Sequence, residues 1–322
     1  MARSGPPRVL LSRPLPDAVV ARAHSLFDIE LRKSTLPMSE AEMRSALALY
    51  DGVMPTLGDQ FGAKIFAEFG RPRCRILANF GVGYNHIDVQ AATDHGVKVT
   101  NTPGAVTDAT ADIALTLILM SARRAAEGER LVRSGQWAGW HPTQMLGLHV
   151  TGRKLGIVGM GRIGQAIARR CHFGFGMEVF FHNRSPKAVD FPATQVSSLT
   201  ELAAQVDILV VAVPGGAETH HLIGADVFAA MQPHAHFINI ARGDIVEEAA
   251  LVAALQAGQI GGAGLDVYEH EPQVPQALRD MDNVTLLPHL GTAALNVRTD
   301  MGMLVLDNLA AFFDGTPLPN PV

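Results

Sequence analysis

Short apolar runs rich in β-branched residues alternate with longer stretches of mixed polarity along most of the chain. In the first third of the sequence these runs predict five strands, because short apolar runs between polar segments are typical of buried strands. The predicted strands are residues 8–12, 29–33, 52–56, 74–80 and 97–102. Strands that alternate with helices indicate a parallel sheet with crossover helices.

A second alternating series begins with KLGIVGMG at 154–161. It continues with apolar runs at residues 178–183, 207–214, 236–241, 262–268 and 283–289. Helical patterns separate these runs as well, so the chain contains two strand–helix series, one after the other. We therefore expect the α/β class, with two doubly wound parallel-sheet domains in one chain.

Several stretches carry signals for helices. A serine followed three residues later by a glutamate is typical of a capping box, and this pattern occurs at 39–42 and at 198–201. The segment 107–133 predicts one long helix that connects the two series. A final helix over roughly 293–313 follows the second series and could return to pack on the first domain.

Composition and charge narrow the class of protein. The 322 residues are 48% hydrophobic and 18% charged, which is typical of a globular chain. A net charge of −5 gives no reason to expect nucleic acid or an anionic membrane as partner. Cys74 and Cys171 are too few for a disulfide framework and indicate a reducing compartment. The first residues lack the apolar run of a signal peptide, and the apolar stretch 113–120 is too short to span a bilayer, so we expect a soluble, cytoplasmic protein.

A glycine pattern follows the first strand of the second series. Residues 159–164, GMGRIG, match G-x-G-x-x-G between the apolar run LGIV and the helical run QAIARRC. In this setting the first glycine permits a tight turn, the second lets the backbone approach a pyrophosphate, and the third allows close packing of helix on strand. The pattern predicts a dinucleotide site, with a ligand-free βα turn as the alternative.

The glycine turn gives the two domains different expected roles. The second series predicts a Rossmann dinucleotide-binding domain, residues 105–290. The first series, together with the final helix, predicts a flavodoxin-like substrate domain, residues 1–104 plus 291–322.

The residue that distinguishes NAD from NADP is expected about 20 residues after the glycine turn, at the end of the next strand. Asn183 stands there in place of the acid that would accept hydrogen bonds from a ribose 2′-hydroxyl. Arg184, Ser185 and Lys187 follow and could donate to a 2′-phosphate. We therefore expect NADP(H), with NAD(H) and a merely solvated Arg184 as the alternatives.

Three segments of the second series end in residues suited to acid–base chemistry at a carbonyl group. Arg242 directly follows the apolar strand at 236–241, and its guanidinium could bind a carboxylate through two hydrogen bonds. Glu271 lies beyond the next strand, and His289 ends the last one. Ligands of doubly wound sheets bind at the carboxyl ends of the strands, so we expect these residues to converge.

The residue types indicate a division of roles. His289 would act as general acid towards a developing alkoxide, and ionised Glu271 would orient the imidazole and favour its protonated form. Arg242 would hold the carboxylate of the substrate. Each residue alone is a weak signal, because strand-end histidines and arginines are often simply solvated. Their order after a glycine turn is more specific.

Six longer motifs extend this interpretation over the chain. They are NFGVGYNHID (79–88), GVKVTNTPG (96–104), LGIVGMGRIG (155–164), NIARGDIVEEAALVAAL (239–255), GAGLDVYEHEP (262–272) and NVTLLPHLGT (283–292). With these motifs the chain resembles the D-isomer-specific 2-hydroxyacid dehydrogenase family, and within it the glyoxylate/hydroxypyruvate reductases. The resemblance covers essentially the whole chain.

The resemblance implies roles for particular residues. The catalytic Arg, Glu and His of the family fall on the three residues named above, and its substrate carboxylate also binds backbone amides, here those of Val82 and Gly83. Trp140 resembles a tryptophan that reaches into the active site of the partner subunit, which implies a homodimer, with an ordinary interface residue as the alternative. The residues expected at the coenzyme site, those of the glycine turn and strand end included, are Thr110, Gly159, Met160, Gly161, Arg162, Ile163, Gly164, Asn183, Arg184, Ser185, Val213, Pro214, Ile240, Ala241, Asp266 and Gly291.

The expected function is therefore the NADPH-dependent reduction of a small 2-oxo acid, such as glyoxylate or hydroxypyruvate, to a D-2-hydroxy acid. One rival is a non-catalytic protein that binds NAD(P) as a sensor, against which the intact set of Arg, Glu and His argues. Another is an NAD-dependent dehydrogenase of D-2-hydroxy acids, including phosphoglycerate. No histidine or cysteine spacing predicts a metal site, and none is expected.

Overall fold

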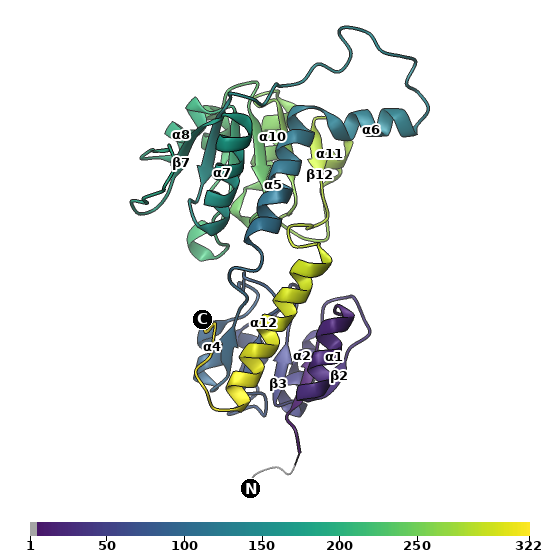
Figure 1. Cartoon of the computed structure of the whole chain (residues 1–322), viewed down its shortest axis with the longest axis vertical. Helices are drawn as coiled ribbons and strands as arrows, with labels where there is room; N and C mark the ends of the chain where they lie inside the picture. The colour runs from purple at the N-terminus through teal and green to yellow at the C-terminus, as the bar shows by residue number, and fades with distance from the viewer. Residues whose placement is uncertain (1–4) are drawn as a thin grey trace. The chain divides into compact units, whose positions relative to one another are not determined.

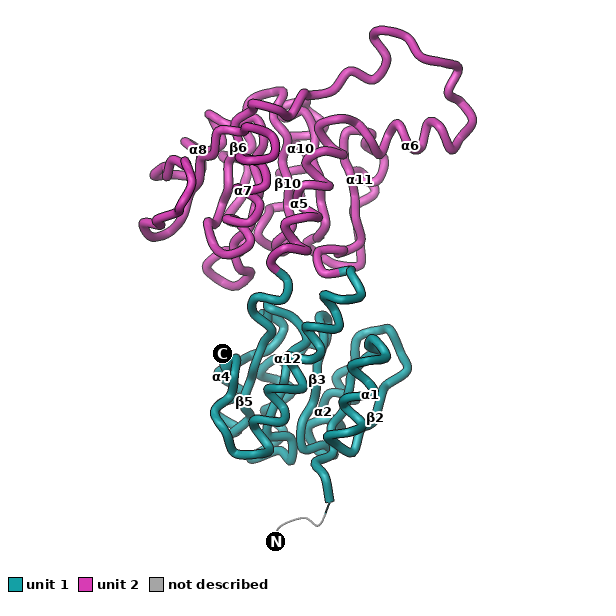
Figure 2. The backbone as a smooth tube through the Cα atoms, in the orientation of Figure 1, with its two compact units in different colours: residues 1–106, 293–322 teal, residues 107–292 magenta. Residues whose placement is uncertain are grey.

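Two parallel β-sheets organise the chain, one in each of two units (Figure 1). The computed structural model describes residues 5–322. One unit contains the residues up to Val106 together with Ala293–Val322, and the other contains Thr107–Thr292 (Figure 2). Helices cover both faces of each sheet, so the expected α/β class with two doubly wound domains is confirmed.

The first unit has a sheet of five parallel strands in the order β2-β1-β3-β4-β5. This order, with the first strand between the second and the third, is that of flavodoxin-like folds. The register aligns Val9 of β1 with Ile29 of β2 on one side and with Gly52 of β3 on the other. The strands are β1 (Arg8–Leu11), β2 (Asp28–Leu31), β3 (Gly52–Met54), β4 (Ile76–Ala78) and β5 (Lys98–Thr100).

Two helices from opposite ends of the sequence cover one face of this sheet. Helices α1 (Asp17–Leu26) and α12 (Leu295–Phe313) contact each other and share a core with β1, β3 and β4. They approach so closely that a Cβ added at Gly302 would lie 2.5 Å from Val19. The other face is covered by α2 (Glu40–Leu49), α3 (Ala63–Phe66) and α4 (Val89–Asp94).

The second unit has a sheet of seven parallel strands in the order β12-β11-β10-β9-β6-β7-β8. Counted from its own first strand, this is the Rossmann order with one strand added at the β12 edge. The short edge strand β8 was not predicted, because its two exposed polar residues carry no apolar signal. The strands are β6 (Lys154–Val158), β7 (Glu178–His182), β8 (Thr194–Gln195), β9 (Ile208–Val211), β10 (His236–Asn239), β11 (Gly262–Leu265) and β12 (Val284–Leu286).

Apolar side chains fill the space between this sheet and the helices on its two faces. Helices α5 (Thr107–Ala122) and α7 (Arg162–Phe175) pack side by side on one face. The other face carries α8 (Leu199–Gln205), α9 (Ala225–Ala230) and α10 (Glu248–Gln256). The short α11 (Gln276–Asp280) precedes β12.

The prediction of one helix over 107–133 is wrong. The helix ends at Ala122, and α6 (Ala125–Arg133) begins after Arg124, whose φ of 53° is left-handed. The carbonyl of Ala122 accepts a hydrogen bond of 2.7 Å from the amide of Leu148, a residue of the chain that returns after α6. This long-range contact occupies a carbonyl near the end of the helix, and sequence periodicity gives no sign of it.

The two expected capping boxes differ in outcome. At the start of α2 the box is complete, since Ser39 accepts from the amide of Glu42 and the Glu42 carboxylate accepts from the amide of Ser39. At the start of α8 only half of the box forms. Ser198 accepts from the amide of Glu201, but the Glu201 carboxylate bonds to the amide and hydroxyl of Ser197.

Candidate active site

The sheet order of the second unit brings the three predicted catalytic residues to one edge. Strands β10, β11 and β12 are neighbours and parallel, so their carboxyl ends lie together. Arg242 follows β10, Glu271 lies in the loop after β11, and His289 follows β12.

His289 and Glu271 form a hydrogen-bonded pair. Nδ1 of His289 lies 2.9 Å from Oε2 of Glu271, and the other carboxylate oxygen accepts a 3.1 Å hydrogen bond from the amide of Tyr268. Burial alone would raise the pKa of Glu271, but the hydrogen bond and charge of His289, with smaller contributions from Tyr268 and Arg242, lower it overall. Glu271 is therefore ionised at neutral pH, as support of an imidazolium requires.

Asp266 fixes the backbone that carries His289. His289 has a left-handed φ of 56°, which is uncommon for a residue with a Cβ. Its amide donates to the carbonyl of Asp266 at 2.9 Å, and the two Asp266 carboxylate oxygens accept from the amides of Leu290 at 2.6 Å and Gly291 at 2.8 Å. Asp266 is 1% exposed, and this burial raises its pKa.

The guanidinium of Arg242 forms no ion pair within residues 5–322. Its Nη1 donates to the carbonyl of Ala241 at 2.6 Å, and its Nε is buried with no hydrogen-bond partner among residues 5–322. Burial lowers the pKa of this guanidinium, although the charges of Glu271 and Asp244 oppose that effect. A guanidinium in this state favours an anionic ligand that can accept two hydrogen bonds.

The turn that bears Arg242 is set by Asn239, a residue that the sequence did not single out. The Asn239 side chain donates to the carbonyl of Arg242 at 2.9 Å and accepts from the amide of Ala241 at 3.0 Å. Asparagine side chains commonly stabilise turns in this way, but nothing in the sequence pattern distinguished this one.

The three glycines of the turn after β6 fit the expected dinucleotide site for different reasons. Gly159 has a φ of 97°, and a Cβ there would lie 2.6 Å from Val213 and 2.8 Å from the carbonyl oxygen of Ala212. At Gly164 a Cβ would lie 2.1 Å from the carbonyl oxygen of Gly159. A Cβ at Gly161 would meet nothing within 4 Å, and no side chain caps the helix that begins after it. The helix N-terminus is thus open to a phosphate group.

The end of β7 contacts this turn. Oδ1 of Asn183 accepts from the amide of Met160 at 3.3 Å, and its Nδ2 donates to the carbonyl of Ser185 at 2.9 Å. Arg184 is 85% exposed and forms an ion pair with the equally exposed Glu218. The strand end therefore offers an exposed cationic side chain, paired only with an exposed glutamate of another loop, and no carboxylate of its own.

The remaining residues expected at the coenzyme site lie in several places in this unit. Thr110 donates to the carbonyl of Gly291 at 3.2 Å, which joins these two residues to the Asp266 turn. The Met160 side chain is buried in the core, so only its backbone could meet a ligand. Ile240 and Ala241 are buried, Ile163 and Val213 are partly buried, and Arg162 and Pro214 are exposed.

Val82 and Gly83 lie in the loop after β4 in the first unit. Nδ2 of Asn79 donates to the carbonyls of Gly81 and Gly83, both at 3.0 Å, and Nδ2 of Asn101 donates to the carbonyl of Val82 at 2.8 Å. The amides of Val82 and Gly83 donate no hydrogen bond in the described part of the chain. Fixed carbonyls and free amides are the pattern of a backbone anion site, and Asn79 and Asn101 were not recognised from the sequence.

Trp140 lies apart from the Arg242, Glu271 and His289 side chains. It belongs to the segment after α6 and is 77% exposed. Within residues 5–322 it takes part in no hydrogen bond or ring contact with the three. The structure does not bring Trp140 to the candidate site of its own chain.

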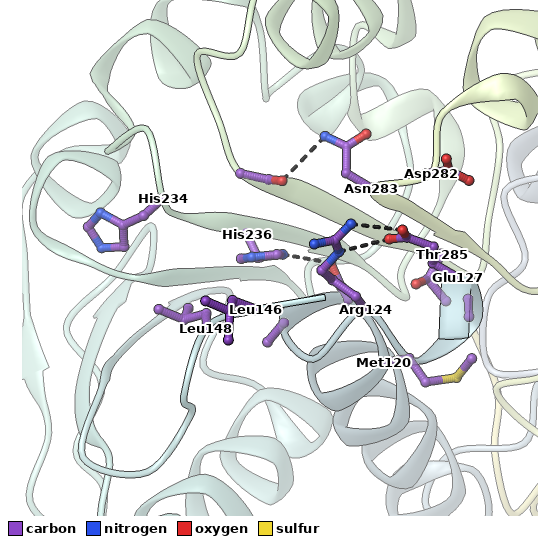
Figure 3. Close-up of a pocket in the computed structure, with 15 residues that line it drawn as sticks. Met120, Arg124, Glu127, Leu146, Leu148, His234, His236, Asp282, Asn283 and Thr285 are labelled. Atoms are coloured by element: carbon purple, nitrogen blue, oxygen red, sulfur yellow. Dashed lines mark hydrogen bonds and ion pairs between the residues drawn. The ribbon is translucent and has the colours of Figure 1, made fainter. Parts of the chain in front are cut away.

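A pocket of about 540 Å³ lies at the opposite, amino-terminal edge of the same sheet (Figure 3). Its polar groups are largely paired with one another: Ser121 with His236 at 2.7 Å, and Arg124 with Glu127 at 2.7 Å. Burial lowers the pKa of His236 to about 4, so this histidine is neutral. The pocket is remote from the carboxyl ends of the strands and is not the candidate active site.

Residues 5–322 contain neither a cluster of metal ligands nor a helix suited to crossing a membrane. No group of three or more His, Cys, Asp or Glu side chains is placed to hold a metal ion. None of the helices in this part of the chain combines the length and the apolar character that a membrane crossing requires.

Known proteins match this chain over its length. The D-isomer specific 2-hydroxyacid dehydrogenase NAD binding domain matches residues 115–291. A glyoxylate reductase from Thermococcus onnurineus is 41% identical, over 98% of this chain and 96% of the relative. The chain therefore belongs to the D-isomer specific 2-hydroxyacid dehydrogenase family and is an oxidoreductase with an NAD(P)-binding domain.

Solved structures agree with this assignment. An NADPH-dependent glyoxylate/hydroxypyruvate reductase from Sinorhizobium meliloti, in complex with NADP and malonate, is 38% identical with a TM-score of 0.86, covering 98% of this chain and 96% of that one. A glyoxylate reductase from Paecilomyes thermophila is 32% identical with a TM-score of 0.87, covering 98% of each chain.

Proposed function

We propose that this protein reduces small 2-oxo acids, such as glyoxylate and hydroxypyruvate, to D-2-hydroxy acids with NADPH. The proposal rests chiefly on Arg242, whose Nε is buried and has no hydrogen-bond partner among residues 5–322. It lies at the strand edge that also carries the His289–Glu271 pair. A carboxylate would supply the missing acceptor, and a carbonyl beside it could receive a proton from His289. The names of the relatives support the same substrate class.

The proposed chemistry divides among the residues of this chain. Arg242 binds the substrate carboxylate and orients the carbonyl, and the free amides of Val82 and Gly83 are further donors to an anionic substrate. Bound NADPH supplies the hydride that adds to C2 of the 2-oxo acid. His289 donates a proton to the oxygen on that carbon, and ionised Glu271 stabilises the imidazolium until it does so.

The coenzyme preference rests on the end of β7. The side-chain oxygen of Asn183 accepts a hydrogen bond from the glycine turn. Arg184 and Ser185 are exposed beside it, and the strand end has no acidic residue in the position that would bind the ribose 2′-hydroxyl. A guanidinium favours a 2′-phosphate, whereas NAD(H) binding ordinarily relies on a carboxylate there. The NADP complex of the Sinorhizobium meliloti relative supports this choice.

We also propose that the protein is a cytoplasmic homodimer. The α6 segment has no buried residue, and it is followed by exposed Trp137, Trp140 and Leu146. Such an apolar group on a soluble chain favours coverage by a second copy. Both cysteines are free and buried, in keeping with a reducing compartment.

The test is a substrate panel. Initial rates are measured with glyoxylate, hydroxypyruvate and larger 2-oxo acids, once with NADPH and once with NADH, and with acetaldehyde as a control that lacks the carboxylate. We expect coenzyme oxidation with the small 2-oxo acids, faster with NADPH, and almost none with acetaldehyde. The absence of oxidation with every 2-oxo acid would leave the sensor protein as the better description.

A further inference from the structure

Three loops of the second unit meet around the carboxylate of Glu269. Oε1 lies 2.8 Å from Nε2 of His221, a residue of the loop after β9. Oε2 accepts a hydrogen bond from the amide of Glu248 at 3.3 Å, at the start of α10, and the Glu248 carboxylate accepts from the amide of Glu269 at 3.4 Å. Both Glu269 oxygens are therefore occupied, and its side chain is only 17% exposed.

The peptide group between Tyr268 and Glu269 packs closely against the turn that carries Arg242. A Cβ added at Gly243 would lie 1.8 Å from the carbonyl carbon of Tyr268 and 2.3 Å from the amide nitrogen of Glu269. His221 joins this turn from the other side, because its amide donates to the carbonyl of Asp244 at 2.8 Å. The loops of His221, Arg242 and Glu269 are thus held to one another by backbone and side-chain contacts.

This junction of the three loops lies next to the amide of Tyr268, which supports the carboxylate of Glu271. The amide of Tyr268 donates to Oε1 of Glu271, whose Oε2 bonds to His289. The Tyr268 amide belongs to the preceding peptide, so a shift of the Tyr268–Glu269 peptide that displaces Tyr268 would also displace the donor that orients Glu271. It would also move the surface on which Gly243, and with it Arg242, rests.

The charges around the junction fit a fixed, ionised Glu269. Burial raises its pKa, but the hydrogen bond from His221 and the contacts to Glu248 and His270 lower it overall. The neighbouring Glu248 has a raised pKa because of burial, to which the charge of Glu269 adds. The surroundings therefore favour the charged form of Glu269, whereas burial disfavours that of Glu248.

We propose that Glu269 and His221 are a positioning pair that sets Glu271, and through it His289, relative to Arg242. Neither is a catalytic residue, since both act through the Tyr268–Glu269 peptide. The inference rests on the proposed function, because it takes Glu271 and His289 as the reacting pair.

The test compares Glu269→Ala, Glu269→Gln, His221→Ala and the double Ala variant with the wild type. Glu269→Ala should lower kcat for 2-oxo acid reduction about tenfold with little change in KM for the coenzyme, since a small displacement of reacting groups has a large effect. Glu269→Gln keeps an acceptor for the amide of Glu248, and its NH2 group can donate to Nε2 of His221 in the tautomer protonated on Nδ1, so it should restore most of kcat. The double variant should be little worse than either single one. Glu247→Ala, which removes an exposed carboxylate without side-chain hydrogen bonds, is the control.

The pH profile separates positioning from a general loss of stability. With Glu271 displaced, the hydrogen bond that His289 makes to it changes, so the pH profile of the reduction rate should differ between Glu269→Ala and the wild type. A loss of kcat with an unmoved profile, or additive effects of the two Ala variants, would overturn the proposal. Titration of the His289 ring signal by NMR, identified by its absence in His289→Gln, gives the same answer without any substrate. If the wild type reduced no 2-oxo acid, only the proposed function would fail, and the NMR shift would still test the positioning pair.

Discussion

At the scale of single residues, Arg184 and Glu218 should determine how strongly the 2′-phosphate of a coenzyme binds. They form an ion pair in which both side chains are at least 80% exposed, so the pair itself adds little to stability. Glu218 competes with an anionic ligand for the guanidinium and adds a negative charge close to it. The two residues therefore have opposite expected effects on coenzyme choice.

Arg184→Ala should raise KM for NADPH roughly tenfold and leave KM for NADH nearly unchanged, because only the phosphate interaction is lost. Glu218→Gln should lower KM for NADPH, since it frees Arg184. Steady-state kinetics with both coenzymes measure both effects. Equal changes for NADPH and NADH would contradict the assignment of Arg184 to the phosphate.

The strand-end positions of the three proposed catalytic residues are visible in the sequence, but the turn-holding roles of the residues that support them, Asp266 of the expected coenzyme site included, are not. Arg242, Glu271 and His289 each follow an apolar strand, which is visible in the sequence. Asp266 and Asn239 act by holding backbone amides and carbonyls of turns, as do Asn79 and Asn101 in the first unit. Those turn conformations depend on contacts between distant segments, which periodicity does not encode.

At the scale of elements, the β6–α7 turn gives each glycine a separate physical requirement. Gly164 lies where the helix meets the strand and has no room for a Cβ, whereas Gly161 has open space. Stability and coenzyme binding should therefore separate between these two positions.

Gly164→Ala should lower the free energy of unfolding by about 1–3 kcal/mol, as is usual when a methyl group is forced into a packed site. Gly161→Ala should leave stability nearly unchanged and weaken coenzyme binding at least tenfold, because its methyl group would occupy the space open to a pyrophosphate. Chemical denaturation and fluorescence titration with NADPH measure the two quantities. Equal stability of both variants, or unchanged affinity in Gly161→Ala, would refute this division.

The capping box of α2 gives a pH-dependent prediction. Hydrogen bonds from Arg32 and from the amide of Ser39 lower the pKa of Glu42 from 4.5 to about 2. The folded pKa is below the unfolded one, so Glu42 stabilises the fold above pH 4.5 and loses this effect as the pH falls towards 2. The wild type should therefore unfold at higher temperature than Glu42→Gln at neutral pH, and this gap should shrink in acid. A gap that does not change with pH would argue against the ionic role of the box.

The end of α5 and the start of α8 differ from what the sequence pattern predicted. The periodic segment 107–133 contains a break because Ala122 bonds to Leu148 and Arg124 turns left-handed. The complete box at Ser39–Glu42 is local and was predicted correctly. At Ser198 the Glu201 carboxylate could accept a hydrogen bond from the amide of Ser197 as well as from that of Ser198. The sequence pattern does not distinguish the two donors.

At the scale of the whole molecule, the parallel sheets follow from alternating strands and helices, whereas assembly requires knowledge of the surface. Val132, Trp137, Trp140 and Leu146 are each at least 50% exposed within and after α6. Apolar residues along a sequence do not reveal whether they are buried in their own chain. Only their exposure in the structure points to a second copy.

Sedimentation should accordingly give twice the mass of the 34.4 kDa chain. Replacement of Trp137, Trp140 and Leu146 by serine should produce a folded monomer, because these side chains belong to none of the apolar cores within residues 5–322. Circular dichroism provides the control for folding. A monomeric wild type, or a triple variant that remains dimeric, would contradict the proposed interface.

The proposed division of roles has His289, held by Glu271, donate the proton while Arg242 binds the carboxylate. It is tested most directly by the turnover of His289→Ala with glyoxylate, with its NADPH affinity measured in parallel. We predict a fall in kcat of at least about 100-fold, the usual loss for a general acid, and a Kd for NADPH within about twofold of wild type. Turnover close to that of the wild type would contradict the account.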